Sequence, residues 1–326
     1  MKINFLLLRH LSTGAILFSL IAVMLSSCGK NETEMKDSEP AITEITETEM
    51  TDAAQIEDTY QFGSNLLSCD FHIQEEFDYF ISQAQVYDTQ GDIISGTVPH
   101  HLLAGRMITS FFNTAAISRP DIETVVILAP MHEPHGMKLS TTLSDWAAPN
   151  GLLPNERSFS ETFISELGAI ENDSIITADH SAAALIPFVK YYFPDVSVSV
   201  LLVSSLSDMN ISDRLTEVLF SFSEEKNCLF VFSVDFSHYL NPVQTALRDI
   251  ETREAILSGD INKIRFMNDK NLDSPRTICT FLQLTERLDG KISELDHSNS
   301  LIISELPHGH PDFDEGLTSY FIFVGS

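Results

Sequence analysis

The chain has 326 residues, 43% of them hydrophobic, and its 47 acidic residues against 19 Lys and Arg give a net charge of −28. This charge argues against a nucleic-acid partner, because binding to phosphate needs clustered Lys and Arg. The length and the apolar content allow one large domain or two small ones. Three cysteines remain beside Cys28, too few and too odd in number for a disulfide framework.

The first residues have the layout of a secretory signal. Lys2 and Arg9 precede an apolar run at residues 14–25. The run is shorter than the roughly 20 apolar residues of a spanning helix. Residues 25–28 (LSSC) resemble the bacterial lipobox, which implies cleavage after residue 27 and lipid on Cys28. We expect a lipoprotein held to the outer face of a bacterial cell membrane; the alternative is a plain signal or anchor with an incidental cysteine.

Residues 28–60 follow the signal and are dominated by Glu, Asp, Thr and Ser, without an apolar period. Such a segment cannot bury enough apolar surface to offset the entropy of ordering. We predict a disordered acidic tether over residues 28–60 that lifts a folded domain, residues 61–326, away from the lipid.

The folded part alternates β-branched runs with helical patterns. Strands are predicted at residues 93–98, 124–128, 196–203, 229–234, 301–304 and 320–324. Helices are predicted at residues 74–85, 102–112, 160–167, 182–192, 211–222, 246–257 and 278–288. This alternation indicates a single three-layer α/β/α domain with a mixed, mostly parallel sheet covered on both faces.

Polar residues that can titrate follow three of these strands. His100 and His101 follow the first, His132 follows the second, and Asp235 and His238 follow the fourth. Because ligand sites of open α/β sheets lie beyond the carboxyl ends of strands, these side chains are candidates for a transition-metal or acid–base site. The alternative for each is a solvated or capping residue. Asp235 either orients a histidine or caps the next turn.

Four further residues are considered with this site. His180 begins a predicted helix, either as part of a cap or as a proton donor at the rim. Cys279 falls in the first turn of another helix, where a thiol has a lowered pKa and binds metal more readily, or is a buried structural cysteine. His101 and His135 are predicted to lie near the site or on the surface rather than to bind metal.

Six blocks, in order, resemble those of the Memo family, also called the AmmeMemoRadiSam system protein B family. The similarity covers residues from about 70 to the C-terminus. The blocks are residues 98–100 (VPH), 127–132 (ILAPMH), 139–154 (LSTTLSDWAAPNGLLP), 179–181 (DHS) with 187–188 (PF), 233–239 (SVDFSHY) and 277–279 (TIC).

The resemblance implies the fold of class III extradiol dioxygenases. It also implies metal ligands at His100, His132 and Cys279, and catalytic or pocket roles for His238, His180 and Asp235. A cysteine ligand favours copper or tightly held iron, with zinc as a further possibility.

The function expected on this basis is redox or dioxygenase-like activity on a small-molecule substrate, in a protein whose partner is the membrane that holds Cys28. Two alternatives stay open. One is a non-catalytic lipoprotein that binds metal at the cell surface. The other is a zinc-dependent hydrolase.

Overall fold

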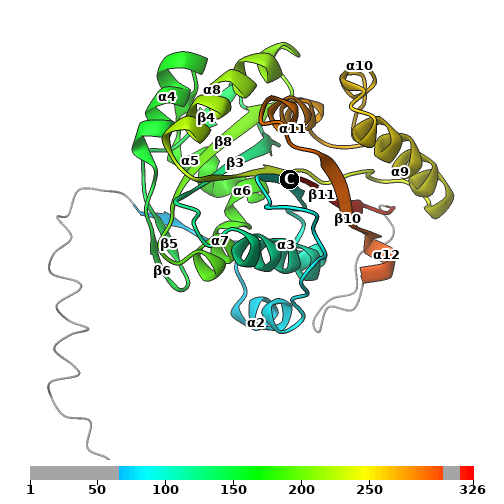
Figure 1. Ribbon diagram of the computed structural model, residues 1–326, viewed down its shortest axis with the longest axis horizontal. Coiled ribbons are helices and arrows are strands. Elements are labelled where there is room, and N and C mark those ends of the chain that lie inside the picture. Colours follow the sequence, from blue (N-terminus) through cyan, green and yellow to red (C-terminus); the bar gives the residue numbers. More distant parts are fainter. Residues whose placement is uncertain (1–65, 304–315) are drawn as a thin grey trace, which may run out of the picture. The chain divides into compact units, whose positions relative to one another are not determined.

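The structure, a computed structural model, describes residues 66–303 and 316–326 (Figure 1). The predicted signal peptide, the predicted lipidation site at Cys28 and the predicted acidic tether lie outside these residues. Within the part of the chain that is described, no helix has the length and apolar character needed to cross a membrane.

An eight-stranded mixed sheet forms the centre of the fold, in the order β10-β11-β2-β9-β3-β8-β4-β7. The four middle strands, β2, β9, β3 and β8, are mutually parallel, whereas β10, β11 and β4 pair antiparallel with their neighbours toward the middle. The strands are β2 (Ser95–Val98), β3 (Thr124–Met131), β4 (Leu139–Thr141), β7 (Ile170–Glu171), β8 (Ser197–Ser204), β9 (Cys228–Ser233), β10 (Ile292–Asn299) and β11 (Ser319–Gly325). A second, three-stranded sheet contains β1 (Leu67–Ser68), β5 (Trp146–Ala148) and β6 (Gly151–Leu153).

Both faces of the middle strands are buried, and successive residues serve two separate cores. In β3, Val125 and Ile127 belong to one hydrophobic cluster, while Val126 and Leu128 belong to the other. This division follows from the period of two in a strand, which points neighbouring side chains to opposite faces. The two cores confirm the predicted α/β class with helices on both sides of the sheet.

The helices divide between these two cores. On the first side lie α2 (Gln74–Ser82), α3 (Gly105–Ser118), α5 (Asp173–Ala178), α6 (His180–Ala183) and α7 (Ile186–Tyr192). On the second side lie α4 (Arg157–Leu167), α8 (Ile211–Glu225), α9 (Pro242–Leu257), α10 (Ile261–Ile264) and α11 (Pro275–Arg287). The single turn η1 (Leu102–Ala104) precedes α3, and α12 (Ser300–Ile303) follows β10. Figure 1 shows α3 and α11 on opposite sides of the sheet.

Two sequence predictions are corrected near residue 300 and residue 185. A strand was predicted at residues 301–304, but residues 301–303 belong to α12, and the strand of this region is β10 immediately before it. β10 escaped notice because its sequence, ISELDHSN, is polar; it pairs with β11 at the edge of the sheet and is only half-buried. The single helix predicted at residues 182–192 is divided into α6 and α7, with Pro187 in the first turn of α7.

Candidate metal centre

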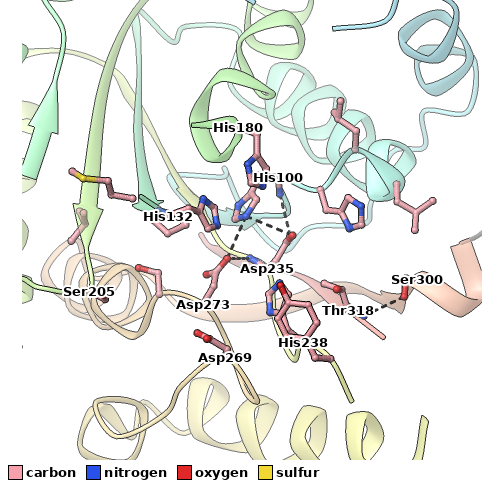
Figure 2. Close-up of a pocket in the computed structure, with 18 of the residues that line it drawn as sticks. His100, His132, His180, Ser205, Asp235, His238, Asp269, Asp273, Ser300 and Thr318 are labelled. Carbon is pink, nitrogen blue, oxygen red and sulfur yellow. Dashed lines mark hydrogen bonds and ion pairs between the residues drawn. The ribbon is translucent and has the colours of Figure 1, made fainter. Parts of the chain in front are cut away.

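A cavity of about 770 Å³ lies at the carboxyl ends of the parallel strands (Figure 2). Residues after β2, β3, β8 and β9 line it, as expected where parallel strands all end at one edge of a sheet. The segments that begin α6 and α11 close two of its sides. Among the described residues the lining contains five histidines and three aspartates, namely His100, His101, His132, His180, His238, Asp235, Asp269 and Asp273.

Three of these imidazoles form a cluster that can hold a metal ion. His100 follows β2, His132 follows β3, and His180 is the first residue of α6. One ring nitrogen from each lies within 4.8 Å of the others. The rings of His132 and His180 are stacked, with centroids 4.6 Å apart, and the His100 ring lies edge-on to both. His180 therefore lies beside His100 and His132 rather than at a distant rim.

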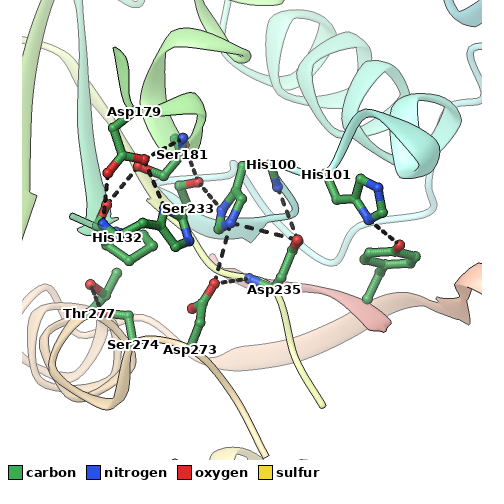
Figure 3. A network of polar contacts seen from close by, with 12 residues as sticks. His100, His101, His132, Asp179, Ser181, Ser233, Asp235, Asp273, Ser274 and Thr277 are labelled. Carbon is green, nitrogen blue, oxygen red and sulfur yellow. Dashed lines mark hydrogen bonds and ion pairs between the residues drawn. The ribbon is translucent and has the colours of Figure 1, made fainter. Parts of the chain in front are cut away.

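The carboxylate of Asp179 orients His132 through two contacts (Figure 3). Asp179 Oδ1 accepts the Nδ1 hydrogen of His132 at 2.8 Å, and Oδ2 accepts the backbone N–H of the same residue at 2.7 Å. Burial lowers the pKa of His132, but the hydrogen bond and charge of Asp179 outweigh burial and raise it. With Nδ1 used in this way, Nε2 is the ring nitrogen of His132 that remains for a metal ion. A carboxylate behind a metal-binding histidine is a recurring arrangement in metalloproteins.

A hydroxyl group fixes the tautomer of His100. Ser233 Oγ donates to the backbone carbonyl of Ser181 at 2.5 Å, so it must accept from Nδ1 of His100 at 2.9 Å. His100 therefore has its hydrogen on Nδ1 and its lone pair on Nε2. Burial lowers the pKa of His100 to about 3, which keeps the ring neutral, the form that binds metal.

Two carboxyl groups border Nε2 of His100. Nε2 lies 3.6 Å from Oδ2 of Asp235 and 3.4 Å from Oδ2 of Asp273. Burial and the charge of Asp235 raise the pKa of Asp273 well above its ordinary value. For Asp235, burial raises the pKa but the facing histidines lower it by more, so Asp235 is ionised.

Two buried polar atoms of the cavity lining have no hydrogen-bond partner among the described residues: Oδ1 of Asp273 and Nδ1 of His238. An orphaned polar atom is costly in an interior unless a ligand, ion or water satisfies it. Three imidazoles with ring nitrogens within 4.8 Å of one another, together with these unpaired atoms, fit a site built to receive a metal ion and a polar ligand. Imidazole nitrogens suit iron, copper and zinc.

The loop after β9 places His238 beside this cluster. The backbone N–H of His238 donates to the carbonyl of Asp269, and the next residue, Tyr239, has a φ of 59°. Gly316 packs against this turn: a Cβ there would meet the carbonyl carbon of Tyr239 at 2.6 Å, so only glycine fits. Burial lowers the pKa of His238, which leaves its ring neutral and able to accept a proton.

The predicted ligand Cys279 lies elsewhere. It is fully buried in the second hydrophobic core and does not line the cavity. Burial raises the pKa of its thiol to about 11, although nearby Arg265 and Arg276 lower it in part. Cys279 lies away from the cavity because α11 begins at Pro275, and Cys279 is four residues, about 6 Å, further along the helix axis. The ligand cluster of the described residues thus contains His180 in place of Cys279.

The sequence pattern does not single out Asp273 or Ser233. It predicts that His101 and His135 lie near the site or on the surface and do not bind metal. Asp273 directly precedes the N-cap of α11, a signal of position but not of role. His101 lines the cavity, and its Nδ1 shares a hydrogen bond with the hydroxyl group of Tyr320, 2.7 Å away. His135 is exposed beside Glu133 and lies outside the cavity lining.

An α/β sheet with helices on both faces and a cluster of three histidines at its carboxyl edge defines an α/β protein with a possible metal site. Residues 68–304 match the family model described as Memo-like protein, and the chain belongs to this family. It is similar to MEMO1 family proteins of three archaea. The one from Thermoplasma acidophilum is 25% identical over 217 residues, 64% of this chain and 80% of the relative. Those from Desulfurococcus amylolyticus and Thermoplasma volcanium are 26% and 24% identical, over 64% of this chain and 73% and 78% of the relatives.

Proposed function

We propose that this protein is a metal-dependent oxidoreductase, dioxygenase-like in its chemistry, that acts on a small organic substrate. The observation that carries the proposal is the cluster of His100, His132 and His180, whose ligand atoms lie within 4.8 Å of one another in the wall of a cavity. A cavity of about 770 Å³ has room for a small molecule beside a metal ion. A site meant only to store metal has no need for this space.

Iron or copper at the three imidazoles would supply redox chemistry with molecular oxygen. The remaining groups of the cavity have roles that follow from their protonation. Neutral His238, with its unpartnered Nδ1, takes up a proton from a bound hydroxyl group. Asp273, whose pKa is raised, is the candidate proton donor, and Asp235 accepts the backbone N–H of His100 and so fixes the position of that residue.

A zinc-dependent hydrolase is the second candidate, and one observation favours it. The cluster offers three imidazoles, the donor set found in some catalytic zinc sites. The two candidates differ in their need for oxygen. Protein loaded with iron or copper should consume O₂ in the presence of small aromatic diols, whereas a hydrolase loaded with zinc should cleave an activated ester such as p-nitrophenyl acetate.

The metal site is tested by metal analysis of anaerobically purified protein. His132→Ala should lose at least three quarters of the bound metal, while His135→Ala should retain it. His135 is a matched control, because it lies three residues further along the same loop, exposed and outside the cavity. Equal metal content in both variants, or no metal in the wild-type protein, contradicts the proposal. Bound metal without turnover in either assay supports a non-catalytic metal-binding protein instead.

We further propose that the mature chain is anchored outside the cytoplasm by lipid on Cys28. The support is the order of a basic start, the apolar residues 14–25 and the LSSC sequence at residues 25–28. Cys28→Ala should move the protein from the membrane fraction to the soluble fraction, and Cys69→Ala should not. If the Cys28 variant stays fully in the membrane fraction, the anchor is not on this cysteine.

A further inference from the structure

One cation borders the candidate metal centre. Arg276, in the first turn of α11, is the single Lys or Arg among the described residues that line the cavity. Nε of Arg276 donates to the backbone carbonyl of Ser207 at 2.8 Å, which ties the guanidinium to the chain just beyond β8. Nothing in the metal chemistry proposed above uses this charge.

The guanidinium of Arg276 lacks the partner that such a charge ordinarily has. No carboxylate of the described residues lies within 4.0 Å of it. The side chain is half-buried, and burial lowers its pKa, an effect that the field of Asp208 opposes. A partly desolvated guanidinium without an ion pair is unfavourable unless a ligand supplies the anion. In a chain with 47 acidic residues, an arginine left unpaired in a cavity calls for a binding role.

The position of Arg276 fits a ligand that also reaches the histidines. Asp273, three residues earlier in the chain, lies 3.4 Å from Nε2 of His100. β8, which leads to Ser207, pairs with β3, which leads to His132. Ser205, two residues before Ser207, lines the cavity and lies on the His132 side of the view in Figure 2. Arg276 and the three clustered histidines therefore line one cavity.

We propose that Arg276 binds the carboxylate of a small organic acid, so that the substrate of this site is an anion held by Arg276 while its other end lies at the histidines. This assignment of substrate class rests on the proposed function. Arginine is suited to the role because its planar guanidinium matches a carboxylate with two parallel hydrogen bonds. A single guanidinium, with Asp235 and Asp269 also in the lining, matches one negative charge rather than the two of a phosphate monoester.

The test measures binding and needs no turnover. The full-length protein in detergent is titrated with benzoate, phenyl phosphate and benzyl alcohol, and dissociation constants are taken from NMR shift changes, with metal and after removal of metal by a chelator. Benzoate should bind at least about tenfold more tightly than benzyl alcohol, the magnitude expected for a charge-assisted hydrogen bond. Arg276→Gln should remove this preference, and Arg276→Lys should restore part of it.

Arg287→Gln is the matched control, since Arg287 lies on the same helix but outside the cavity lining, and it should bind benzoate as the wild-type protein does. The thermal melting profile and the metal content of Arg276→Gln establish that it folds. Equal affinity of Arg276→Gln and wild type for benzoate, or no preference of wild type for benzoate over benzyl alcohol, overturns the proposal. Tighter binding of phenyl phosphate than of benzoate overturns the choice of a carboxylate. If benzoate binding persists while metal binding fails, the anion site stands and the proposed function falls.

Discussion

Asp179 holds His132 by both its oxygens: Oδ1 lies 2.8 Å from the ring Nδ1, and Oδ2 lies 2.7 Å from the backbone nitrogen of the same histidine. Asp179 is also the N-cap of α6, where its Oδ1 accepts the backbone N–H of Ser181. One carboxylate thus fixes the ring of one clustered histidine, His132, and begins the helix whose first residue, His180, is another member of the cluster. The neighbouring positions of His132 and His180 depend on this side chain.

Asp179→Asn should weaken metal binding by about 10- to 100-fold, because an outer carboxylate raises the basicity of a metal-binding imidazole and fixes its orientation. The affinity is measured by competition with a chelator of known metal affinity. Glu133→Gln is the control, since Glu133 is next to His132 in the chain but highly exposed. An unchanged affinity in Asp179→Asn means that the ring of His132 does not need this partner.

In the metal-free protein, the pKa values of His132 and His100 should be shifted in opposite directions from their ordinary value of 6.5. The pKa of His132 is raised by Asp179, and burial lowers that of His100 to about 3. The His132–Asp179 contact therefore contributes stability that is complete below pH 6.5 and is lost as the pH rises through the raised pKa of His132. NMR titration of the imidazole resonances measures whether the pKa of His132 lies above that of His100. Asp179→Asn should lower the pKa of His132. A pKa of His132 below that of His100 contradicts the arrangement.

Cys279→Ser should leave metal affinity unchanged and lower stability. The thiol is fully buried in the second core, so the more polar hydroxyl of serine loses its hydration there, at a cost of about 1–3 kcal/mol in the free energy of unfolding. Urea denaturation and metal analysis on the same preparation measure both effects. If Cys279→Ser loses metal but keeps its stability, Cys279 is a metal ligand.

Asp249 is a buried carboxylate outside the cavity, and replacing it should destabilise the fold. The hydroxyls of Ser237 and Ser319 donate to its Oδ1 at 3.0 and 2.6 Å, and Nε2 of His297 lies 3.0 Å from its Oδ2. These contacts join α9 to β10, β11 and the loop that carries His238.

Asp249→Asn should lower the free energy of unfolding by about 2–4 kcal/mol, because it leaves buried hydrogen-bond donors without a charged acceptor. Urea denaturation measures the change. Asp121→Asn is the control: Asp121 is half-exposed and paired with Arg119, and its replacement should cost less than about 1 kcal/mol. Equal stability of the two variants contradicts a structural role for Asp249.

The sequence predicted the features that local pattern controls. β-branched runs such as those in β3, β8 and β9 are recognisable because both faces of these strands are buried, and the histidines at residues 100 and 132 are recognisable because each directly follows such a run. A parallel sheet brings the carboxyl ends of its strands to one edge, so the neighbourhood of His100, His132 and Asp235 follows from the strand pattern alone. The order of six short blocks indicated the Memo-like family, and the family model confirms it.

Features that depend on pairing and on helix rotation needed the tertiary structure. β10 is a strand because β11 supplies its hydrogen bonds, and nothing in its polar sequence indicates that. The position of His180 also needed the tertiary structure. Successive residues are rotated by about 100° around a helix axis, so the residue at which α6 or α11 begins decides which side chain faces the cavity. The sequence by itself therefore determined the fold class and two of the three clustered histidines. Only the packed structure placed His180 among them and Cys279 in the core, because the start and rotation of a helix are fixed by contacts between segments far apart in the chain.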